Sequence, residues 1–184
     1  FQSNGHDLDA NFFTRANSQD FAYRFLHDRI QQAAYSLIPE AQKRSTHLSI
    51  GQLLLKSIPQ TEREEKIFEI VNQLNWGLES LAEPAVRSEL AQLNLMAGQK
   101  AKAATAYKAA WDYFMAGRQL LPGDCWQSQY ELTLKLYEAA VETAYLNGDF
   151  ESMEKLVQVV IEKARAILEK IRVYEIKSEA LVAQ

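Results

Sequence analysis

The sequence has little of what most catalytic and metal sites require. Its 184 residues include one cysteine, seven glycines and four prolines. The lone Cys125 cannot form an internal disulfide, so a reducing, cytoplasmic location is the simplest expectation. No HExxH or CxxC motif occurs, and no metal is expected. No G-x-x-x-x-G-K-[ST] phosphate loop occurs either, so we expect these residues alone to bind no cofactor.

Charge and hydropathy exclude two classes of partner. The formal net charge is -4 and the sequence pI is about 5.5, whereas nucleic-acid-binding domains usually present a basic face. The same negative charge disfavours docking on an anionic membrane. No apolar run approaches the roughly 18 residues of a membrane span. We therefore expect neither nucleic acid nor a membrane as a partner.

The composition is that of a globular protein, with 47% hydrophobic and 24% charged residues. The length suits one domain or a short helical array. The first four residues resemble the end of a protease site joined to an expression linker, so we expect the chain to be a piece of a longer protein. Residues 1–19 are polar and weakly patterned. We expect a flexible terminus there, and not a metal site at His6, Asp7 and Asp9.

Prolines and one Asn-Gly-Asp sequence divide the rest of the chain into predicted helices. The first predicted helix begins near Phe21 and ends before Pro39, the second runs from Ala41 to Ser57, the third from about Thr61 to Leu81, and the fourth begins at Pro84. Further breaks are predicted at Pro122-Gly123 and at Asn147-Gly148-Asp149. At the last of these, Asp149 is the expected N-cap of the helix that follows.

Between these breaks the apolar residues recur at helical spacings of three and four. One stripe runs from Ile67 to Leu81, a second from Tyr130 to Ala144, and a third from Phe150 to Ile171. Several helices carry apolar residues on a second face as well, which indicates helices packed between two neighbours. An alternating pattern typical of a strand occurs only at residues 21–25.

A weak internal repeat is visible. Residues 93–98 precede an Ala-rich helix predicted over 100–110, and residues 144–150 precede another helix. In the second case an aromatic, Phe150, follows Gly148 by two residues, which resembles the turn of a tetratricopeptide repeat. Gly98 and Gly148 are 50 residues apart (148 − 98), beyond the roughly 34-residue period of that repeat. We therefore expect an all-α fold of seven or eight helices in antiparallel hairpins, forming a short, right-handed, degenerate tetratricopeptide-like solenoid.

The pair His27-Asp28 is the candidate for chemistry. One hypothesis is a phospho-accepting His of a sensor kinase, although the residues that usually follow such a His are missing here. A second is structural, with Asp28 capping a helix N-terminus beside a packed His. The third comes from a resemblance. It rests on Phe25-Leu26-His27-Asp28-Arg29-Ile30, Ala34-Tyr35, Ser36-Leu37-Ile38-Pro39, Lys43-Arg44, His47 and Ile50-Gly51-Gln52-Leu53-Leu54.

This string resembles the end of the winged-helix region in signal-transducing AAA-like NTPases. These include the large cyanobacterial-type multi-sensor signal transduction kinases with Ser/Thr and histidine kinase domains. The resemblance extends over most of residues 20–180. It implies a winged-helix tail over 20–58 and a helical repeat array over 59–184. It also implies that ATP or ADP binds the parent protein's NTPase domain, and that His27 there contacts the ADP phosphate in the off state.

The resemblance implies a non-catalytic regulatory and protein-interaction module that couples an upstream NTPase to downstream sensor and kinase domains. Its partner would be a protein, a peptide or a neighbouring domain. Weak candidates for contact residues are Tyr107, Trp111, Tyr130 and Tyr137, which helix packing explains equally well. Two alternatives stay open: His27 completing a nucleotide site made by another domain, and self-association as an oligomerisation scaffold. His47 is expected to be packed, and core packing is the default for Trp76, Trp111 and Trp126.

Overall fold

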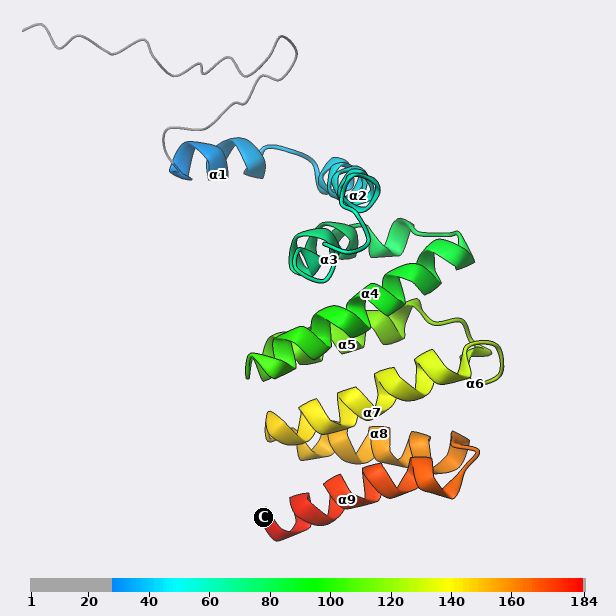
Figure 1. Ribbon diagram of the computed structural model, residues 1–184. Coiled ribbons are helices and arrows are strands. Elements are labelled where there is room, and N and C mark those ends of the chain that lie inside the picture. Colours follow the sequence, from blue (N-terminus) through cyan, green and yellow to red (C-terminus); the bar gives the residue numbers. More distant parts are fainter. Residues whose placement is uncertain (1–27, 184) are drawn as a thin grey trace, which may run out of the picture. The chain divides into compact units, whose positions relative to one another are not determined.

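The computed structural model describes residues 28–183, and every regular element in that range is helical (Figure 1). This confirms the all-α prediction. The predicted terminus at 1–19 and the short strand at 21–25 lie outside the described residues. The elements are α1 (Asp28–Ser36), α2 (Glu40–Ser57), α3 (Ile67–Trp76), the 3-10 helix η1 (Leu78–Ser80), α4 (Pro84–Ala103), α5 (Tyr107–Leu120), α6 (Cys125–Ser128), α7 (Tyr130–Leu146), α8 (Phe150–Lys163) and α9 (Ile167–Ala183).

The described residues divide into two compact units between Glu40 and Ala41. The first contains α1. The second contains α2 from Ala41 onward and all later helices, and its buried apolar residues run from Ile58 to Ala180. The winged-helix origin of residues 20–58 stays a prediction.

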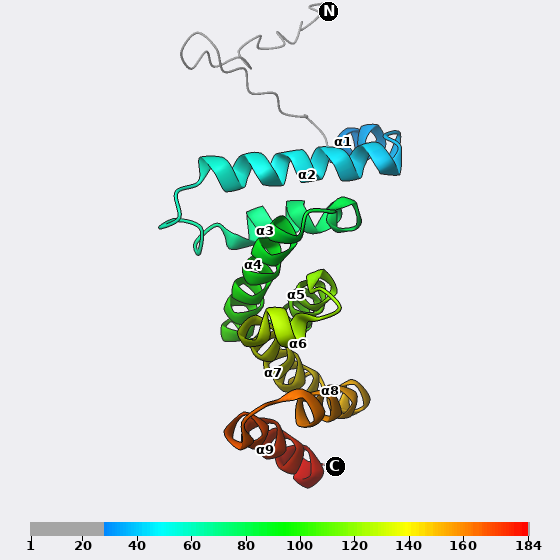
Figure 2. The same ribbon diagram turned by 90° about the vertical axis from the view of Figure 1, so that its right-hand side faces the viewer.

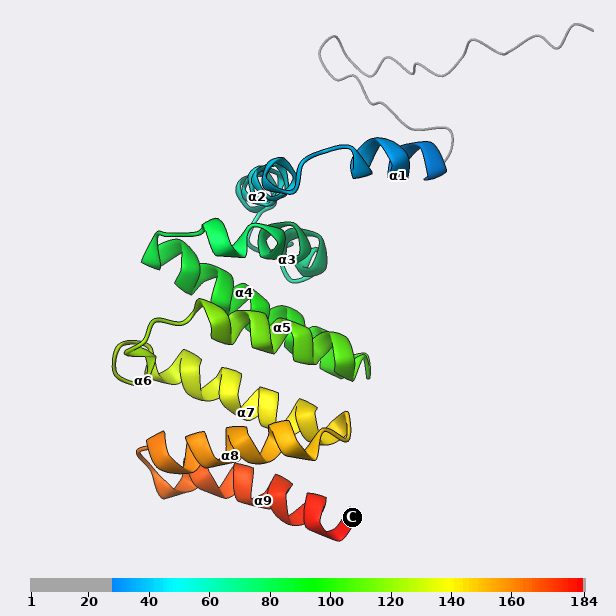
Figure 3. The ribbon, with the colours of Figure 1, turned by 180° about the vertical axis from the view of Figure 1, so that it is seen from behind.

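From α4 onward, the long helices that follow one another in sequence (α4, α5, α7, α8 and α9) pack side by side in opposite directions (Figures 1 and 3). The most extensive packing joins α4 to α5, followed by α7 to α8 and α5 to α7, while α9 contacts both α7 and α8. Helices α5 and α7 are therefore covered on two sides, as their two apolar faces predict. The hand of a solenoid stays a prediction.

Helix α2 runs alongside α3 at close range, in the opposite direction (Figures 1 and 2). Two glycines allow this approach, since an added Cβ at Gly51 would lie 2.6 Å from Cδ2 of Leu74, and one at Gly77 would lie 2.8 Å from Cβ of Leu48. This antiparallel arrangement brings the first half of α2 beside the C-terminal end of α3.

The predicted breaks are confirmed at all four prolines and at residues 147–149. Pro84 occupies the first turn of α4, where its missing N–H costs nothing. Asp149 caps α8, and its carboxylate accepts a hydrogen bond of 3.0 Å from the Ser152 amide. Gly148 adopts the left-handed conformation with φ of 73°, which glycine tolerates without strain.

The helix predicted over Thr61–Leu81 is wrong at both ends. Residues 60–66 form turns, and α3 covers only Ile67–Trp76. Tertiary hydrogen bonds hold this segment. Arg63 donates to the Leu55 carbonyl at 2.9 Å, and the Lys100 ammonium donates to the Glu64 and Glu65 carbonyls at 2.7 and 2.9 Å. The Glu64 and Glu65 carbonyls are thereby satisfied outside a helix, and Arg63 ties the segment to the last turn of α2.

The continuous apolar stripe predicted from Phe150 to Ile171 is also wrong. Helix α8 ends at Lys163, Ala164 is extended, and α9 begins at Ile167. The break contains neither Gly nor Pro. Its exposed amides find acceptors elsewhere, because Arg165 N donates to the Tyr130 hydroxyl at 2.7 Å and Ala166 N donates to the Glu169 carboxylate at 2.9 Å. The separate α8 and α9, together with the one-turn α6, give nine α-helices in the described range instead of seven or eight.

The Ala-rich helix predicted over 100–110 is not a separate helix after Gly98, since α4 continues through Gly98 to Ala103. The chain reverses at residues 104–106, where Thr105 has a positive φ of 58°. The Ala-rich segment 100–110 is therefore a hairpin turn and parts of two helices. At Gly98 itself the packing requires a residue without a side chain, because the ring of Phe114 lies directly against it.

Candidate functional site

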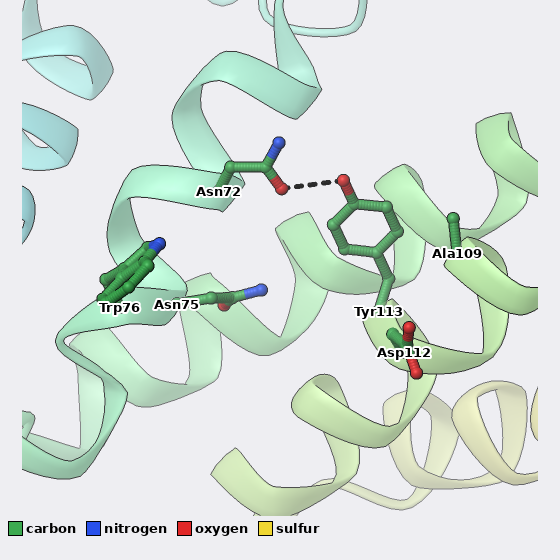
Figure 4. A pocket seen from close by; sticks show the side chains of 6 residues that line it. All are labelled: Asn72, Asn75, Trp76, Ala109, Asp112 and Tyr113. Atoms are coloured by element: carbon green, nitrogen blue, oxygen red, sulfur yellow. Dashed lines mark hydrogen bonds between the residues drawn. The ribbon is translucent and has the colours of Figure 1, made fainter. Parts of the chain in front are cut away.

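The site that the fold creates is an open groove between α3 and α5, with a volume of about 560 Å³ (Figure 4). Helix α5 buries Ala110, Phe114 and Gly117 on one face against its neighbours. The α5 residues that line the groove lie beside this buried face, at helical spacings of three and four. The lining residues are Asn72, Asn75 and Trp76 from α3, and Ala109, Asp112 and Tyr113 from α5.

Two smaller hollows continue this groove along α5. One has a volume of about 270 Å³ and shares Asn75 and Trp76 with the groove. The other has a volume of about 480 Å³, shares Asp112 with the groove, and includes Arg118. The two smaller hollows share Ala116 and Gln119 of α5. Together they form one surface across the open face of α5, which we call the α5 groove.

The side chain of Tyr113 is fixed at one edge of the α5 groove by two contacts. Its hydroxyl donates to the side-chain oxygen of Asn72 at 2.8 Å (Figure 4), and its ring stacks on Phe68 at 5.7 Å. Burial raises the pKa of the Tyr113 phenol above its usual value; the Asn72 hydrogen bond opposes this increase, and the Asp112 carboxylate adds to it. The phenol therefore stays protonated at neutral pH and acts as a fixed wall.

The amide of Asn75 is fixed from behind by a reciprocal pair. Asn75 donates to Asn94 at 2.9 Å, and the fully buried Asn94 donates back at 3.0 Å. Asn94 also donates to the Leu90 carbonyl at 3.0 Å. Both side-chain amides are thus oriented before any ligand arrives, and Asn75 presents a pre-positioned amide at the groove.

Trp76 is the large aromatic of the α5 groove and is 50% exposed. Core packing was the expectation for this residue, and that expectation is wrong. Its ring stacks on His47 with centroids 4.9 Å apart, and Nδ1 of His47 lies 2.5 Å from the Gln73 side-chain oxygen. The imidazole therefore supports one side of the indole, as expected for a packed His. The rest of the indole faces solvent.

The charged groups of the α5 groove are mixed in sign. Arg44 pairs with Glu79 at 2.5 Å, and Asp112 pairs with Lys108 at 2.8 Å. Arg118 lies over the ring of Tyr137, with 4.3 Å between the guanidinium carbon and the ring centroid. The groove thus combines an aromatic wall, oriented amides and two arginines, Arg44 paired with a carboxylate and Arg118 stacked on a tyrosine. This set suits an extended peptide better than a covalent reaction.

The structure brings two of the four predicted contact residues together, away from the lining of the α5 groove. Tyr130 and Tyr137 pack on Trp126 with centroids 5.9 and 5.1 Å apart, and Arg165 lies over Tyr130 at 4.1 Å. The Tyr130 hydroxyl also donates to Glu169 at 2.6 Å. These rings tie α6 and α7 to the start of α9.

The other two candidates lie apart from each other in the packing. Trp111 is partly buried and packs against the core, and the Tyr107 carbonyl accepts a hydrogen bond of 3.2 Å from Asn147. Their role in partner binding stays a prediction. The sequence analysis did not predict the groove residues Ala109, Asp112 and Tyr113. Their spacing of three and four residues places them on one side of α5, next to its buried face.

His27 lies outside the described residues, and the side chain of Asp28 is not described. Both the nucleotide-sensing and the capping hypotheses for this pair stay predictions. Among the side chains that are described, no group of three or more His, Cys, Asp and Glu is arranged to hold a metal ion. Cys125 is buried. No helix within residues 28–183 is long and apolar enough to cross a membrane.

Comparison with known proteins gives one similarity. The chain is 29% identical over 167 aligned residues, covering 78% of its length, to hybrid signal transduction histidine kinase G of Dictyostelium discoideum. It spans only 5% of the length of that relative. No protein-family model matches the chain, and no solved structure matches it.

Proposed function

We propose that this chain is a non-catalytic regulatory and protein-interaction module of a multidomain signal transduction kinase. The similarity to a segment of a histidine kinase supports the kinase context. The regulatory role, coupling an NTPase switch to sensor and kinase domains, rests on the sequence resemblance. ATP or ADP would bind another domain of the parent protein, so the chain alone should show no ATP hydrolysis. Measurable turnover by the purified chain would overturn the proposal.

The observation that carries the interaction role is the α5 groove with its half-exposed Trp76. Exposed aromatics in pre-formed grooves are typical anchors of protein interfaces. Asn75 is already oriented by Asn94, so a peptide backbone could bond to it at little entropic cost. The partner would be a peptide segment of another protein or of a neighbouring domain.

A displayed library of random dodecapeptides tests this role. Peptides selected on the wild-type chain should lose at least about tenfold in affinity for Trp76→Ala, because buried Trp anchors dominate interface energies. Tyr174→Ala is the matched control, since Tyr174 is a similarly exposed aromatic on α9 and is absent from the groove lining. Equal affinity for wild type and Trp76→Ala would remove the α5 groove as the binding surface.

A second candidate, self-association, is favoured by α9. The exposed apolar side chains of α9 lie opposite the face that packs on α7 and α8, which carries Val173, Ile176 and Ala180. They are Ile167 (77% exposed), Leu168 (75%), Ile171 (42%), Leu181 (67%) and Val182 (89%). A second copy of the chain could cover this stripe by antiparallel pairing of two α9 helices.

Light scattering over a range of concentrations tests the second candidate. A dimer that is lost in Leu168→Glu and kept in Leu53→Glu would support it, since Leu53 is 65% exposed on α2. A wild-type chain that stays monomeric at all concentrations would exclude it.

A further inference from the structure

Arg118 differs from the other partly buried arginines of the described chain. Arg87 donates from all three guanidinium nitrogens to backbone carbonyls, those of Leu81, Gln119 and Leu120, at 2.8–3.2 Å. Arg63 donates to two carbonyls and lies 3.8 Å from a Glu89 carboxylate oxygen. These two side chains have strong oxygen acceptors.

The hydrogen bonds of Arg118 are weak by comparison. Nη1 donates to the thioether sulfur of Met115 at 3.0 Å, and Nη2 donates to the Tyr137 hydroxyl at 3.2 Å. Nε is buried and has no acceptor among the described residues. No carboxylate of the described chain forms an ion pair with Arg118, because Asp112, which lines the same hollow, pairs with Lys108. A partly buried guanidinium with so few acceptors is costly unless something else pairs with it.

The position of Arg118 on α5 does not account for this arrangement. Arg118 lies in the last turn of the helix, where a cation interacts favourably with the helix dipole. That interaction explains a positive charge at this position, but it provides no acceptor for Nε and no carboxylate for the guanidinium. The guanidinium is also fixed in place by the Tyr137 ring below it at 4.3 Å. It lines the hollow of about 480 Å³ that forms part of the α5 groove.

We propose that Arg118 binds a carboxylate of the peptide that occupies the α5 groove, the side chain of a Glu or Asp residue. This inference rests on the proposed peptide-binding function and names the chemistry of the partner. A carboxylate would replace the Met115 thioether as the acceptor. The planar guanidinium of Arg118 can donate two parallel N–H bonds to the two carboxylate oxygens. One guanidinium beside Asp112 compensates a single negative charge, which favours a carboxylate over a doubly charged phosphate.

The experiment uses three immobilised pools of nonapeptides with random flanks and a fixed central Glu, Gln or Lys. The labelled wild-type chain should be retained about tenfold more on the Glu pool than on the Gln pool, and least on the Lys pool, because a charge-assisted pair is stronger than a neutral one. Arg118→Met should bring the Glu-to-Gln ratio close to one. Arg118→Lys keeps the positive charge and loses the planar pair of N–H donors, so it should give an intermediate Glu-to-Gln ratio.

Arg165→Met is the matched control, because Arg165 also lies over a tyrosine ring, at 4.1 Å from Tyr130, and its guanidinium donates to the Trp126 carbonyl. It should keep the wild-type ratio, and circular dichroism should show both Met variants folded. Equal retention of the Glu and Gln pools by wild type, or equal effects of the two Met variants, would overturn the inference and leave the proposed function standing. Retention on none of the pools would overturn both.

Discussion

Gly98 lies in the middle of α4, at the point where the Phe114 ring of α5 packs against its backbone. Glycine is normally unfavourable inside a helix by roughly 1 kcal/mol relative to alanine. An added Cβ would overlap three atoms of the Phe114 ring, which is fully buried. The close packing of α4 on α5 therefore depends on the missing side chain.

We predict that Gly98→Ala destabilises the chain by about 1–2 kcal/mol, because an overpacking cost of about 1–3 kcal/mol outweighs the gain in helix propensity. Urea unfolding followed by circular dichroism measures the change. Gly123→Ala is the control, since an added Cβ there meets nothing within 4 Å, and it should leave the free energy of unfolding within about 0.5 kcal/mol. A Gly98→Ala variant as stable as wild type would contradict the packing argument.

Asp149 is the second residue with a defined local role, as the N-cap of α8. Hydrogen bonds from the Ser152 side chain and backbone amide hold the pKa of the Asp149 carboxyl below its usual value. The ionised form is therefore favoured in the folded state. Its contribution to stability is fully present above the unfolded pKa of about 3.9 and disappears as the pH falls below that value through the lowered folded pKa.

Replacing Asp149 by Ala should cost about 1 kcal/mol at pH 7, the usual effect of losing a helix N-cap. Asp149→Asn should retain most of the stability, because its side-chain oxygen still accepts the Ser152 amide, and it should no longer titrate. Thermal unfolding between pH 2 and pH 7 distinguishes these variants. If the difference between wild type and Asp149→Ala persisted unchanged down to pH 2, the charged cap would not be its cause.

At the scale of elements, the buried Asn75–Asn94 pair joins α3 to α4. The two amides bond reciprocally at 2.9 and 3.0 Å, and Asn94 is fully buried. Such a pair replaces water for both groups, so losing one partner leaves the other unsatisfied. The same pair orients Asn75 in the α5 groove.

We predict that Asn94→Ala costs about 2 kcal/mol, through a lost hydrogen bond and a small cavity. The double variant with Asn75→Ala should cost less than the sum of the two single variants by about 1 kcal/mol, because either change alone already breaks the pair. A double-mutant cycle from urea unfolding measures this coupling. Strict additivity would mean that the two amides act independently.

Breaks between the elements could be predicted only where the chain itself carries the signal. Pro39, Pro59, Pro84 and Pro122 lack the amide that a helix interior needs, and Gly148 can take a positive φ. The break at 164–166 has no such residue. Its exposed amides are accepted by Tyr130 and Glu169, and one of these residues lies in a different helix.

At the scale of the whole molecule, the buried core belongs to the second compact unit. All buried apolar residues of the described chain lie between Ile58 and Ala180. Leu48, Leu54 and Leu55 of α2 are partly buried against that core. We therefore expect the unit to fold without the residues that precede it, and to depend on α2.

A fragment of residues 41–184 should unfold cooperatively within about 2 °C of the full chain, since a change near 0.5 kcal/mol corresponds to about 1–2 °C at this size. A fragment of residues 59–184, which lacks α2 and uncovers Leu74 and Trp76, should melt at a clearly lower temperature. Calorimetry of the two fragments makes the comparison. A non-cooperative transition in the longer fragment would show that the core needs residues 1–40.

The candidate site was less predictable than the fold. Tyr130, Tyr137 and Trp111 are prominent in the sequence, and the structure uses their rings for packing between helices. The groove instead exposes Trp76 and the less prominent Asp112 and Tyr113. Exposure depends on which neighbours cover a helix face, and no pattern within one helix contains that information.

The sequence by itself determined that the chain is helical, where prolines and the 147–149 turn end its helices, and that Asp149 caps α8. These features depend on local backbone chemistry and on the period of the apolar residues. Tertiary structure alone decided the α8–α9 break, the passage of α4 through Gly98, the exposure of Trp76 and the incomplete hydrogen bonding of Arg118. Each of these depends on groups that are distant in sequence and meet only when the helices pack.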